Sequence, residues 1–267
     1  MDFSERKTHF RHAPETVGGV FLWRYDMKQA GFIQREQGRV GNEPRKKFCI
    51  SSEVTYALAI ILLALAVAML TAADFGISMV VAPAYLLSLK VGVVTFGQAE
   101  YIIQAGVFIL LCLVIRRFKP IYLMSFVTCL IYGAVLDLWR MLPCFNPSVT
   151  EPGSMALWLR ILMFIVGVLL TSFSVALFFK TYLYPQVYDF FVKAVSFRYG
   201  ISLPAFKTGV DITLLLVSVA MTFCFFGKLE GLNWGTLVMA VFYGSIIRFF
   251  FKKLDGRFLF QKICRAF

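Results

Sequence analysis

The stretch IYGAVLDLWRM, residues 131–141, lies in a long apolar run and nevertheless contains two charged residues, Asp137 and Arg140. The stretch FYGSIIRFFF, residues 242–251, repeats the Tyr-Gly pair and again reaches a charged residue, Arg248. A charged side chain at the centre of a bilayer costs about 2.5 to 3.5 kcal/mol on insertion scales, so each of these charges needs an explanation. Two explanations are open: each charge lies at a membrane boundary, or the chain contains the same unit twice.

The composition of the whole chain predicts a polytopic membrane protein. Apolar residues make up 59% of the 267 residues, which is more than one soluble core of this length could bury. A helix needs about 20 apolar residues to cross the hydrocarbon layer, and six windows approach this length. The six predicted spans are residues 54–73, 98–116, 121–141, 156–180, 208–227 and 232–251.

Two further apolar segments are too short or too polar to be assigned as spans in the same way. Residues 76–90 contain Pro83, and residues 182–197 contain Pro185 and the charged Asp189. Three interpretations are open: spans, surface helices, or re-entrant segments that leave the membrane on the side from which they enter. Basic residues mark the cytoplasmic side of a membrane protein. Six crossings with a cytoplasmic N-terminus place all but four of the 27 Lys and Arg residues inside, so we expect this topology and a cytoplasmic C-terminus.

The two halves of the chain align with each other. Each half reads span, short segment, span, span, and an odd number of spans per half means that the second half enters from the opposite side. Inverted repeats of this kind occur in many secondary transporters. We therefore predict an all-α polytopic membrane protein with six transmembrane helices in two inverted three-helix repeats, each with a short re-entrant or broken helical segment. The matched positions are Val81 with Asp189 and Gly92 with Gly200 at an offset of 108 residues, then Glu100 with Asp211, Tyr132 with Tyr243 and Gly133 with Gly244 at an offset of 111.

This topology divides the chain into five parts. Residues 1–53 form a basic cytoplasmic arm, 54–141 the first membrane repeat, 142–155 an external loop, 156–251 the second membrane repeat, and 252–267 a basic cytoplasmic tail. We expect the two basic parts to contact anionic lipid of the cytoplasmic leaflet. Because the positive-inside pattern accounts for the basic excess, we expect no nucleic-acid partner.

The chain resembles the bacterial YczE/YitT-like integral membrane proteins over roughly residues 54–254. FGIS at 75–78 and YGAVLDL at 132–138 match motifs of the first half, and Asp189 followed by Gly200 matches a motif of the second half. The resemblance implies a multi-pass protein of the bacterial inner (plasma) membrane with a role in transport. The chain departs from the motifs at Met79, Val81, Val187 and Tyr188.

Asp189 is the first candidate for a residue of a substrate or ion pathway. A broken or re-entrant helix has free N-terminal amides inside the protein, and these amides favour anions or bind a carboxylate. Three roles are open: Asp189 caps such a helix, pairs with Lys193 four residues later, or binds a proton or cation during transport.

Four further charged residues are candidates for the same pathway. Glu100 and Asp211 stand near the start of their predicted spans, where a carboxylate either stabilises the helix or faces the pathway. Asp137 and Arg140 share one helix face and either neutralise each other or form a gate. Arg160, near the start of the next predicted span, is another possible partner for Asp137.

No sequence motif indicates an enzyme. The chain has no Gly-rich phosphate loop, no His-Glu-x-x-His motif, and no histidine other than His9 and His12. We therefore expect no catalytic residue, no cofactor and no metal site. The predicted inverted repeat favours a secondary transporter or facilitator of a small solute. The alternative is a non-transporting membrane scaffold or substrate-binding subunit that acts with a partner protein. A homo-oligomer and a soluble partner are both left open.

Overall fold

The computed structural model describes residues 48–116, 120–145, 155–181, 183–201, 203–229 and 231–261, all within one compact unit, Arg45–Phe267. The predicted basic arm up to residue 47 and residues 262–267 of the predicted basic tail lie outside the described residues. Their contacts with anionic lipid therefore stay predictions.

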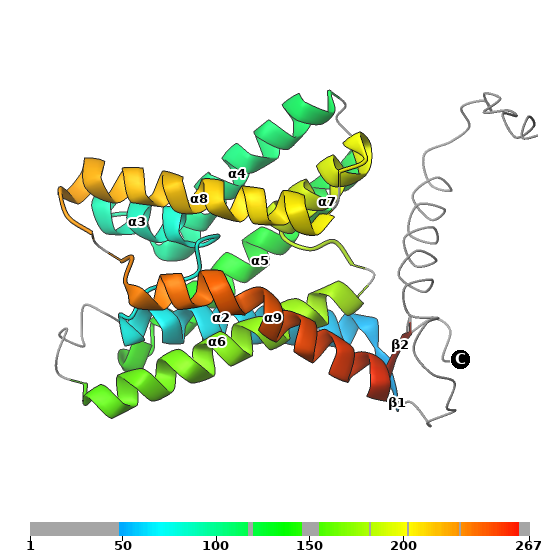
Figure 1. Cartoon of the computed structure of the whole chain (residues 1–267), viewed down its shortest axis with the longest axis horizontal. Coiled ribbons are helices and arrows are strands. Elements are labelled where there is room, and N and C mark those ends of the chain that lie inside the picture. The colour runs from blue at the N-terminus through cyan, green and yellow to red at the C-terminus, as the bar shows by residue number, and fades with distance from the viewer. Residues whose placement is uncertain are drawn as a thin grey trace, which may run out of the picture. The chain divides into compact units, whose positions relative to one another are not determined.

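Eight α-helices dominate the described part of the chain (Figure 1). Six of them are long and apolar enough to cross a membrane, which confirms the six predicted windows and indicates a multi-pass membrane protein. The 3₁₀ turns η1 (Pro120–Tyr122) and η2 (Pro143–Phe145) lie at the two ends of α5. The six long helices are α2 (Ser52–Ala73), α4 (Phe96–Ile115), α5 (Leu123–Arg140), α6 (Leu157–Lys180), α8 (Leu203–Phe226) and α9 (Trp234–Arg257).

The two segments whose role the sequence leaves open form short helices, α3 (Ala82–Val91) and α7 (Val187–Tyr199). At 1.5 Å per residue, their 10 and 13 residues extend about 15 and 20 Å, which is less than the roughly 30 Å of a hydrocarbon core. Each helix ends at a glycine with positive φ, Gly92 at 66° and Gly200 at 67°, a conformation that glycine adopts without strain. Their lengths agree with the prediction of six crossings.

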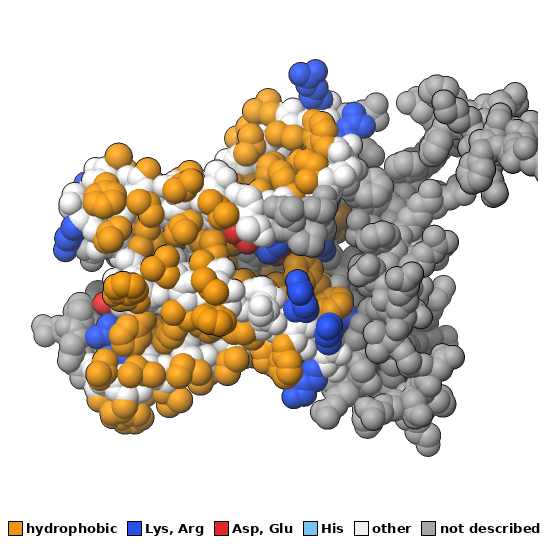
Figure 2. Space-filling view, in the orientation of Figure 1, with side chains coloured by type: hydrophobic (Ala, Val, Ile, Leu, Met, Phe, Trp, Pro, Cys, Tyr) orange, Lys and Arg blue, Asp and Glu red, His pale blue; other side chains and the backbone are white. Residues whose placement is uncertain are grey.

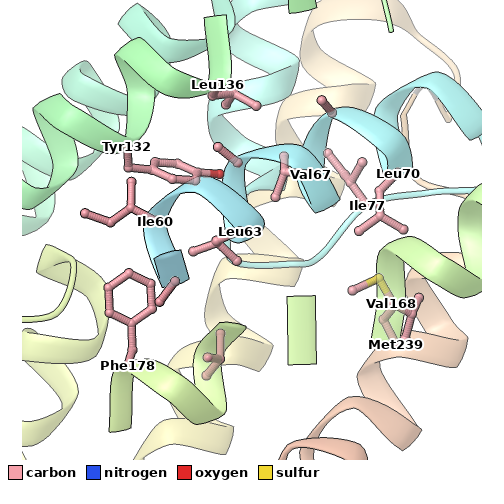
Figure 3. Close-up of a cluster of buried hydrophobic side chains, with 14 of the residues drawn as sticks. Ile60, Leu63, Val67, Leu70, Ile77, Tyr132, Leu136, Val168, Phe178 and Met239 are labelled. Carbon is pink, nitrogen blue, oxygen red and sulfur yellow. The ribbon is translucent and has the colours of Figure 1, made fainter. Parts of the chain in front are cut away.

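Helix α2 packs against both α5 and α6. Small residues permit this close packing. Gly167 on α6 lies so near α2 that a Cβ at this position would be only 2.9 Å from the Leu70 side chain. Larger side chains fill the core around α2, among them Tyr132 and Leu136 from α5 and Met239 from α9 (Figure 3). The fully buried alanines of α2 are Ala59, Ala64, Ala66, Ala68 and Ala73.

The end of α2 lies beside the start of α6, so these two helices run antiparallel. Arg160 of α6 donates a hydrogen bond from Nε to the carbonyl of Ala73 at 3.0 Å, and its guanidinium lies 3.4 Å from an Asp74 carboxylate oxygen. The guanidinium also lies over the Phe75 ring, 4.9 Å from its centroid. Arg160 thereby satisfies a carbonyl that the end of α2 leaves without an intrahelical partner. The sequence suggested Arg160 as a possible partner for Asp137, whereas the structure pairs it with Asp74.

The remaining helices contact one another in a regular set of pairs. α6 packs against α9, and α4 packs against α5. The short helix α3 contacts α4 and α8, and the short helix α7 also contacts α4 and α8. Between α8 and α9 the described chain makes no comparable contact, and Figure 1 shows these two helices apart from each other.

The outward faces of α8 and α9 are apolar. Leu216 on α8 is 64% exposed, and Val241 on α9 is 70% exposed. Orange side chains cover much of the face seen in Figure 2. Exposed apolar side chains in such number suit contact with lipid rather than with water.

A two-stranded parallel pair, which the sequence does not predict, supplements the helices. Strand β1 (Phe48–Ser51) pairs with strand β2 (Phe258–Gln261), with Phe48 opposite Phe258. Because β1 leads into α2 and β2 follows α9, the pair holds the start of the first long helix next to the end of the last one. The fold class is therefore helical with one short strand pair.

Candidate functional site

Two groups of polar side chains lie among the helices at places where a short helix meets the long ones. The Glu100 cluster consists of Glu100 and Gln104 on α4, Tyr132 on α5, Gln186 just before α7 and Tyr188 at its start. The Lys207 cluster consists of Asp189 on α7, Lys207 and Asp211 on α8, and Tyr243 on α9. Polar side chains inside a membrane protein face its interior and mark a functional site by default.

Gln104 organises the Glu100 cluster. Its side-chain carbonyl accepts a hydrogen bond from the backbone N–H of Val187 at 3.2 Å, which orients its NH₂ group. That NH₂ group donates to Glu100 Oε2 at 3.0 Å and to Gln186 Oε1 at 3.5 Å. Glu100 and Gln104 are both fully buried. The first N–H of α7 is thus capped by a side chain of α4, which ties the two helices together.

Several polar atoms of the Glu100 cluster have no hydrogen-bond partner among the described residues. They are Glu100 Oε1, the hydroxyl groups of Tyr132 and Tyr188, and the Gln186 side-chain nitrogen. Burial raises the pKa of Tyr188 well above its ordinary value, so its hydroxyl stays protonated. No Lys or Arg within the described ranges forms an ion pair with Glu100. Most buried polar groups in folded proteins have partners, so this group of unpaired atoms is unusual.

The Lys207 cluster is an ion-pair network. Lys207 Nζ lies 3.2 Å from Asp189 Oδ1 and 3.7 Å from Asp211 Oδ1, and all three side chains are about one-fifth exposed. Electrostatic interactions connect both carboxylates with Tyr243 on α9. Figure 2 shows a hollow between α8 and α9 with acidic and basic side chains visible in it. The network therefore joins α7 to α8.

Asp137 joins the end of α5 to the start of α4. One carboxylate oxygen accepts a hydrogen bond from Thr95 Oγ1 at 2.6 Å, and the other accepts one from the Gly97 backbone N–H at 2.8 Å. Arg140 lies over the Phe96 ring, 5.2 Å from its centroid. In the described part of the chain no ion pair joins Asp137 to Arg140, so their mutual neutralisation by direct contact is not observed.

We expect Asp137→Ala to destabilise the protein by about 1 to 3 kcal/mol, because the Gly97 N–H and the Thr95 hydroxyl would each lose an acceptor. Asp137→Asn should have a smaller effect, since its amide oxygen still accepts one of the two hydrogen bonds. Thermal unfolding of the purified protein in detergent measures both effects. Asp137→Asn also serves as the control for charge loss, because it removes the negative charge but keeps an acceptor. Equal melting temperatures for the Asp137→Ala variant and the wild type would contradict the role given to Asp137.

The structure places the five predicted pathway residues in three locations. Asp189 and Asp211 come together at Lys207, Glu100 lies in its own buried cluster, and Asp137 and Arg140 lie near the contact of α4 with α5. For Asp189, the sequence suggested Lys193 as an ion-pair partner, and the structure shows Lys207 in that role. The part of each residue in a pathway stays a prediction.

Six residues of these clusters were not identified as site residues from the sequence, among them Tyr132 and Tyr243, which appeared only as matched positions of the two halves. Gln104 follows Glu100 by one helical turn inside an apolar run, and Lys207 precedes Asp211 by the same spacing. This spacing is a signal that could have identified both pairs. Gln186 and the hydroxyl of Tyr188 carried no such signal, because their importance depends on contact with α4. No group of three or more potential metal ligands occurs among the residues described by the structure.

Comparison with known proteins adds one finding. A model described as a family of unknown function, DUF6198, matches residues 50–252, which include both polar clusters. The match does not connect the chain with the YczE/YitT-like proteins that its motifs resemble. No curated protein and no solved structure matches the chain.

Proposed function

Because the chain belongs to DUF6198, a family of unknown function, we propose its function from its own helices: a secondary transporter or facilitator that binds a small solute between two inverted repeats. The first repeat would be α2 to α5 and the second α6 to α9. Both have the order long, short, long, long helix. The proposal involves no enzymatic step.

The helix contacts support a two-fold relation that exchanges the two repeats. α2 packs against α5 as α6 packs against α9, and α3 packs against α4 as α7 packs against α8. Between repeats, α3 contacts α8 as α7 contacts α4. Antiparallel packing of α2 and α6 suits repeats of opposite direction.

Individual hydrogen bonds support the same relation. The Lys90 ammonium at the end of α3 donates to the backbone carbonyl of Phe225 at 3.0 Å. The Tyr199 hydroxyl at the end of α7 donates to the backbone carbonyl of Val114 at 2.9 Å. Val114 and Phe225 are separated by 111 residues, the offset at which the two halves of the sequence align. Equivalent carbonyls thus accept hydrogen bonds from equivalent ends of the short helices.

One difference between the repeats carries the proposal: α4 and α5 are in tight contact, whereas α8 and α9 are apart. Gly133 on α5 has no room for a Cβ, which would overlap the Tyr101 ring of α4. Its counterpart in the alignment, Gly244 on α9, has no atom within 4 Å of a Cβ position. A transporter with alternating access needs two equivalent gates of which one is closed while the other is open.

The polar residues receive roles in this scheme. Asp137 would hold the α4–α5 gate closed through Thr95 and Gly97. Asp189 and Asp211, paired with Lys207, would stand at the open side between α8 and α9. Arg140 would accompany Asp137 at the closed side, and Glu100 would lie on the pathway between the gates.

Charge and strand pairing support a location in the bacterial inner membrane with both termini in the cytoplasm. The positive-inside rule places most basic residues on the cytoplasmic side of the predicted topology. The pairing of β1 with β2 keeps both ends of the membrane part on one side, as an even number of crossings requires. The resemblance to the YczE/YitT-like proteins agrees with this location.

Spin-label distances in proteoliposomes test the proposal without knowledge of the solute. One pair of labels at positions 102 and 131 reports on α4 and α5, and the aligned pair at 213 and 242 reports on α8 and α9. All four side chains are exposed, and the six native cysteines are first replaced by alanine. We expect two distances in each pair, with one pair shortening as the other lengthens when an ion gradient is imposed. A single distance in both pairs under every gradient would contradict alternating access and favour the scaffold alternative.

A further inference from the structure

We propose that the Glu100 cluster binds a small organic primary ammonium group. This inference deepens the function proposed above by naming the class of solute, and it rests on that function only for the expectation that the bound solute is transported. The cluster lies where the start of α7 meets α4 and α5.

The first step of the argument is the arrangement of the acceptors. Glu100 Oε2 already accepts a hydrogen bond from Gln104, so Oε1 is the free carboxylate oxygen. Helices α4, α5 and α7, which carry Glu100, Tyr132 and Tyr188, contact one another, and Tyr188 follows Val187, whose backbone N–H binds Gln104. The hydroxyl groups of both tyrosines also lack partners in the described chain. Tyr132 is 1% exposed, Tyr188 is 4% exposed and Glu100 is fully buried. Three buried oxygens that can accept hydrogen bonds thus belong to one cluster.

The second step is the charge of the missing partner. A buried carboxylate without a counter-ion takes up a proton, and the described residues place no Lys or Arg in an ion pair with Glu100. An anionic ligand would find no opposite charge on Glu100 in either protonation state. A cationic ligand would replace that proton, which is released to the solution, and would pair with the carboxylate.

The third step is the kind of cation. A primary ammonium has three N–H donors, which matches one carboxylate oxygen and two hydroxyl oxygens. A calcium ion would need six to eight oxygen ligands, and no group of three or more potential metal-ligating side chains was found among the described residues. The cluster therefore suits an ammonium group better than a calcium ion.

The fourth step is enclosure. Gly97 and Tyr101, which flank Glu100 along α4, both contact α5 through the tight packing at Gly133. Tyr101 also donates a hydrogen bond to the backbone carbonyl of Leu130 at 2.9 Å. The α4–α5 contact thus lies beside the cluster, and its opening would change access to Glu100.

Isothermal titration calorimetry of the full-length protein in detergent tests the inference. The probe is methylammonium chloride, and the matched probe is tetramethylammonium chloride, a cation without N–H donors. We expect saturable binding of methylammonium and none of tetramethylammonium. Glu100→Gln, which keeps the acceptor for Gln104, should weaken binding at least about tenfold, since hydrogen bonds to charged groups are the stronger ones. Asp74→Asn, which changes an exposed carboxylate far from the cluster in the sequence, should bind as the wild type does.

A second variant covers the case in which Glu100→Gln does not fold. Tyr132→Phe removes only an unpartnered hydroxyl and keeps the ring in the core, so it should fold and bind methylammonium roughly tenfold more weakly. No saturable methylammonium binding by the wild type, or equal binding of tetramethylammonium, would overturn the inference. Unchanged binding by Tyr132→Phe and Glu100→Gln would also overturn it. Saturable methylammonium binding together with a single spin-label distance in each pair would contradict only the transporter function. Two spin-label distances in each pair without methylammonium binding would contradict only the ammonium site.

Discussion

Replacing Lys207 by methionine is expected to lower the stability of the protein by about 3 kcal/mol. The Lys207 ammonium lies between two carboxylates, 3.2 Å from Asp189 and 3.7 Å from Asp211. Methionine fills a similar volume but leaves two like charges near each other in a mostly apolar surrounding. Breaking a buried ion pair from one side is strongly destabilising, because the remaining charge stays uncompensated. Thermal unfolding in detergent should show a clear fall in melting temperature.

A triple variant separates the effect of unpaired charge on stability from the effect of side-chain packing. Lys207→Met combined with Asp189→Asn and Asp211→Asn removes both unpaired carboxylates and should recover most of the lost stability. Lys252→Met, which removes an exposed lysine near the end of α9, should leave the melting temperature unchanged. The prediction is wrong if the single Lys207→Met variant unfolds at the same temperature as the Lys252→Met variant.

Introducing a methyl group at Gly97 is expected to destabilise the protein by roughly 2 to 3 kcal/mol, whereas the same change at Gly244 should be neutral or slightly stabilising. A Cβ at Gly97 would overlap the backbone carbonyl oxygen of Gly133 and lie 2.6 Å from Asp137 Oδ2. Backbone atoms cannot turn aside as a side chain can, so α4 and α5 would have to separate. A Cβ at Gly244 meets no atom within 4 Å.

Gly97→Ala and Gly244→Ala are matched because each adds one methyl group to a long helix, and unfolding in detergent compares them directly. The pair also bears on the proposed gates. If α8 and α9 approach each other as α4 and α5 do, Gly244→Leu should lengthen the shortest distance between the labels at 213 and 242. Equal melting temperatures for the two alanine variants would show that the α4–α5 contact is not tight, and would remove the contrast on which the proposed function depends.

Much of the fold was predictable from the sequence. The six spans were confirmed because the apolar length that a helix needs is a local property, which can be counted along the chain. The short lengths of α3 and α7 were predictable for the same reason, together with Pro83 and Pro185. Strand β1 was not predictable, since four residues acquire a strand partner only when the end of α9 is placed beside them.

The candidate site was predictable only in part. The charged members Glu100, Asp189 and Asp211 stand out in an apolar sequence, and all three lie in the two polar clusters. Their partners do not stand out, because Gln104 meets Gln186 across 82 residues and Lys207 meets Asp189 across 18. Arg160 shows the same difficulty, since its partner Asp74 lies 86 residues away.

By itself the sequence determined that this protein has six apolar helices, two short helices, and a few charges that lipid would exclude. The tertiary structure alone decided that Asp189 and Asp211 share one lysine while Glu100 has no counter-ion among the described residues. It also decided that α4 meets α5 while α8 stands apart from α9. The reason is that hydrophobicity acts on each segment separately. A hydrogen bond or ion pair acts over only a few ångströms, so it forms between residues that packing brings together, however distant they are along the chain.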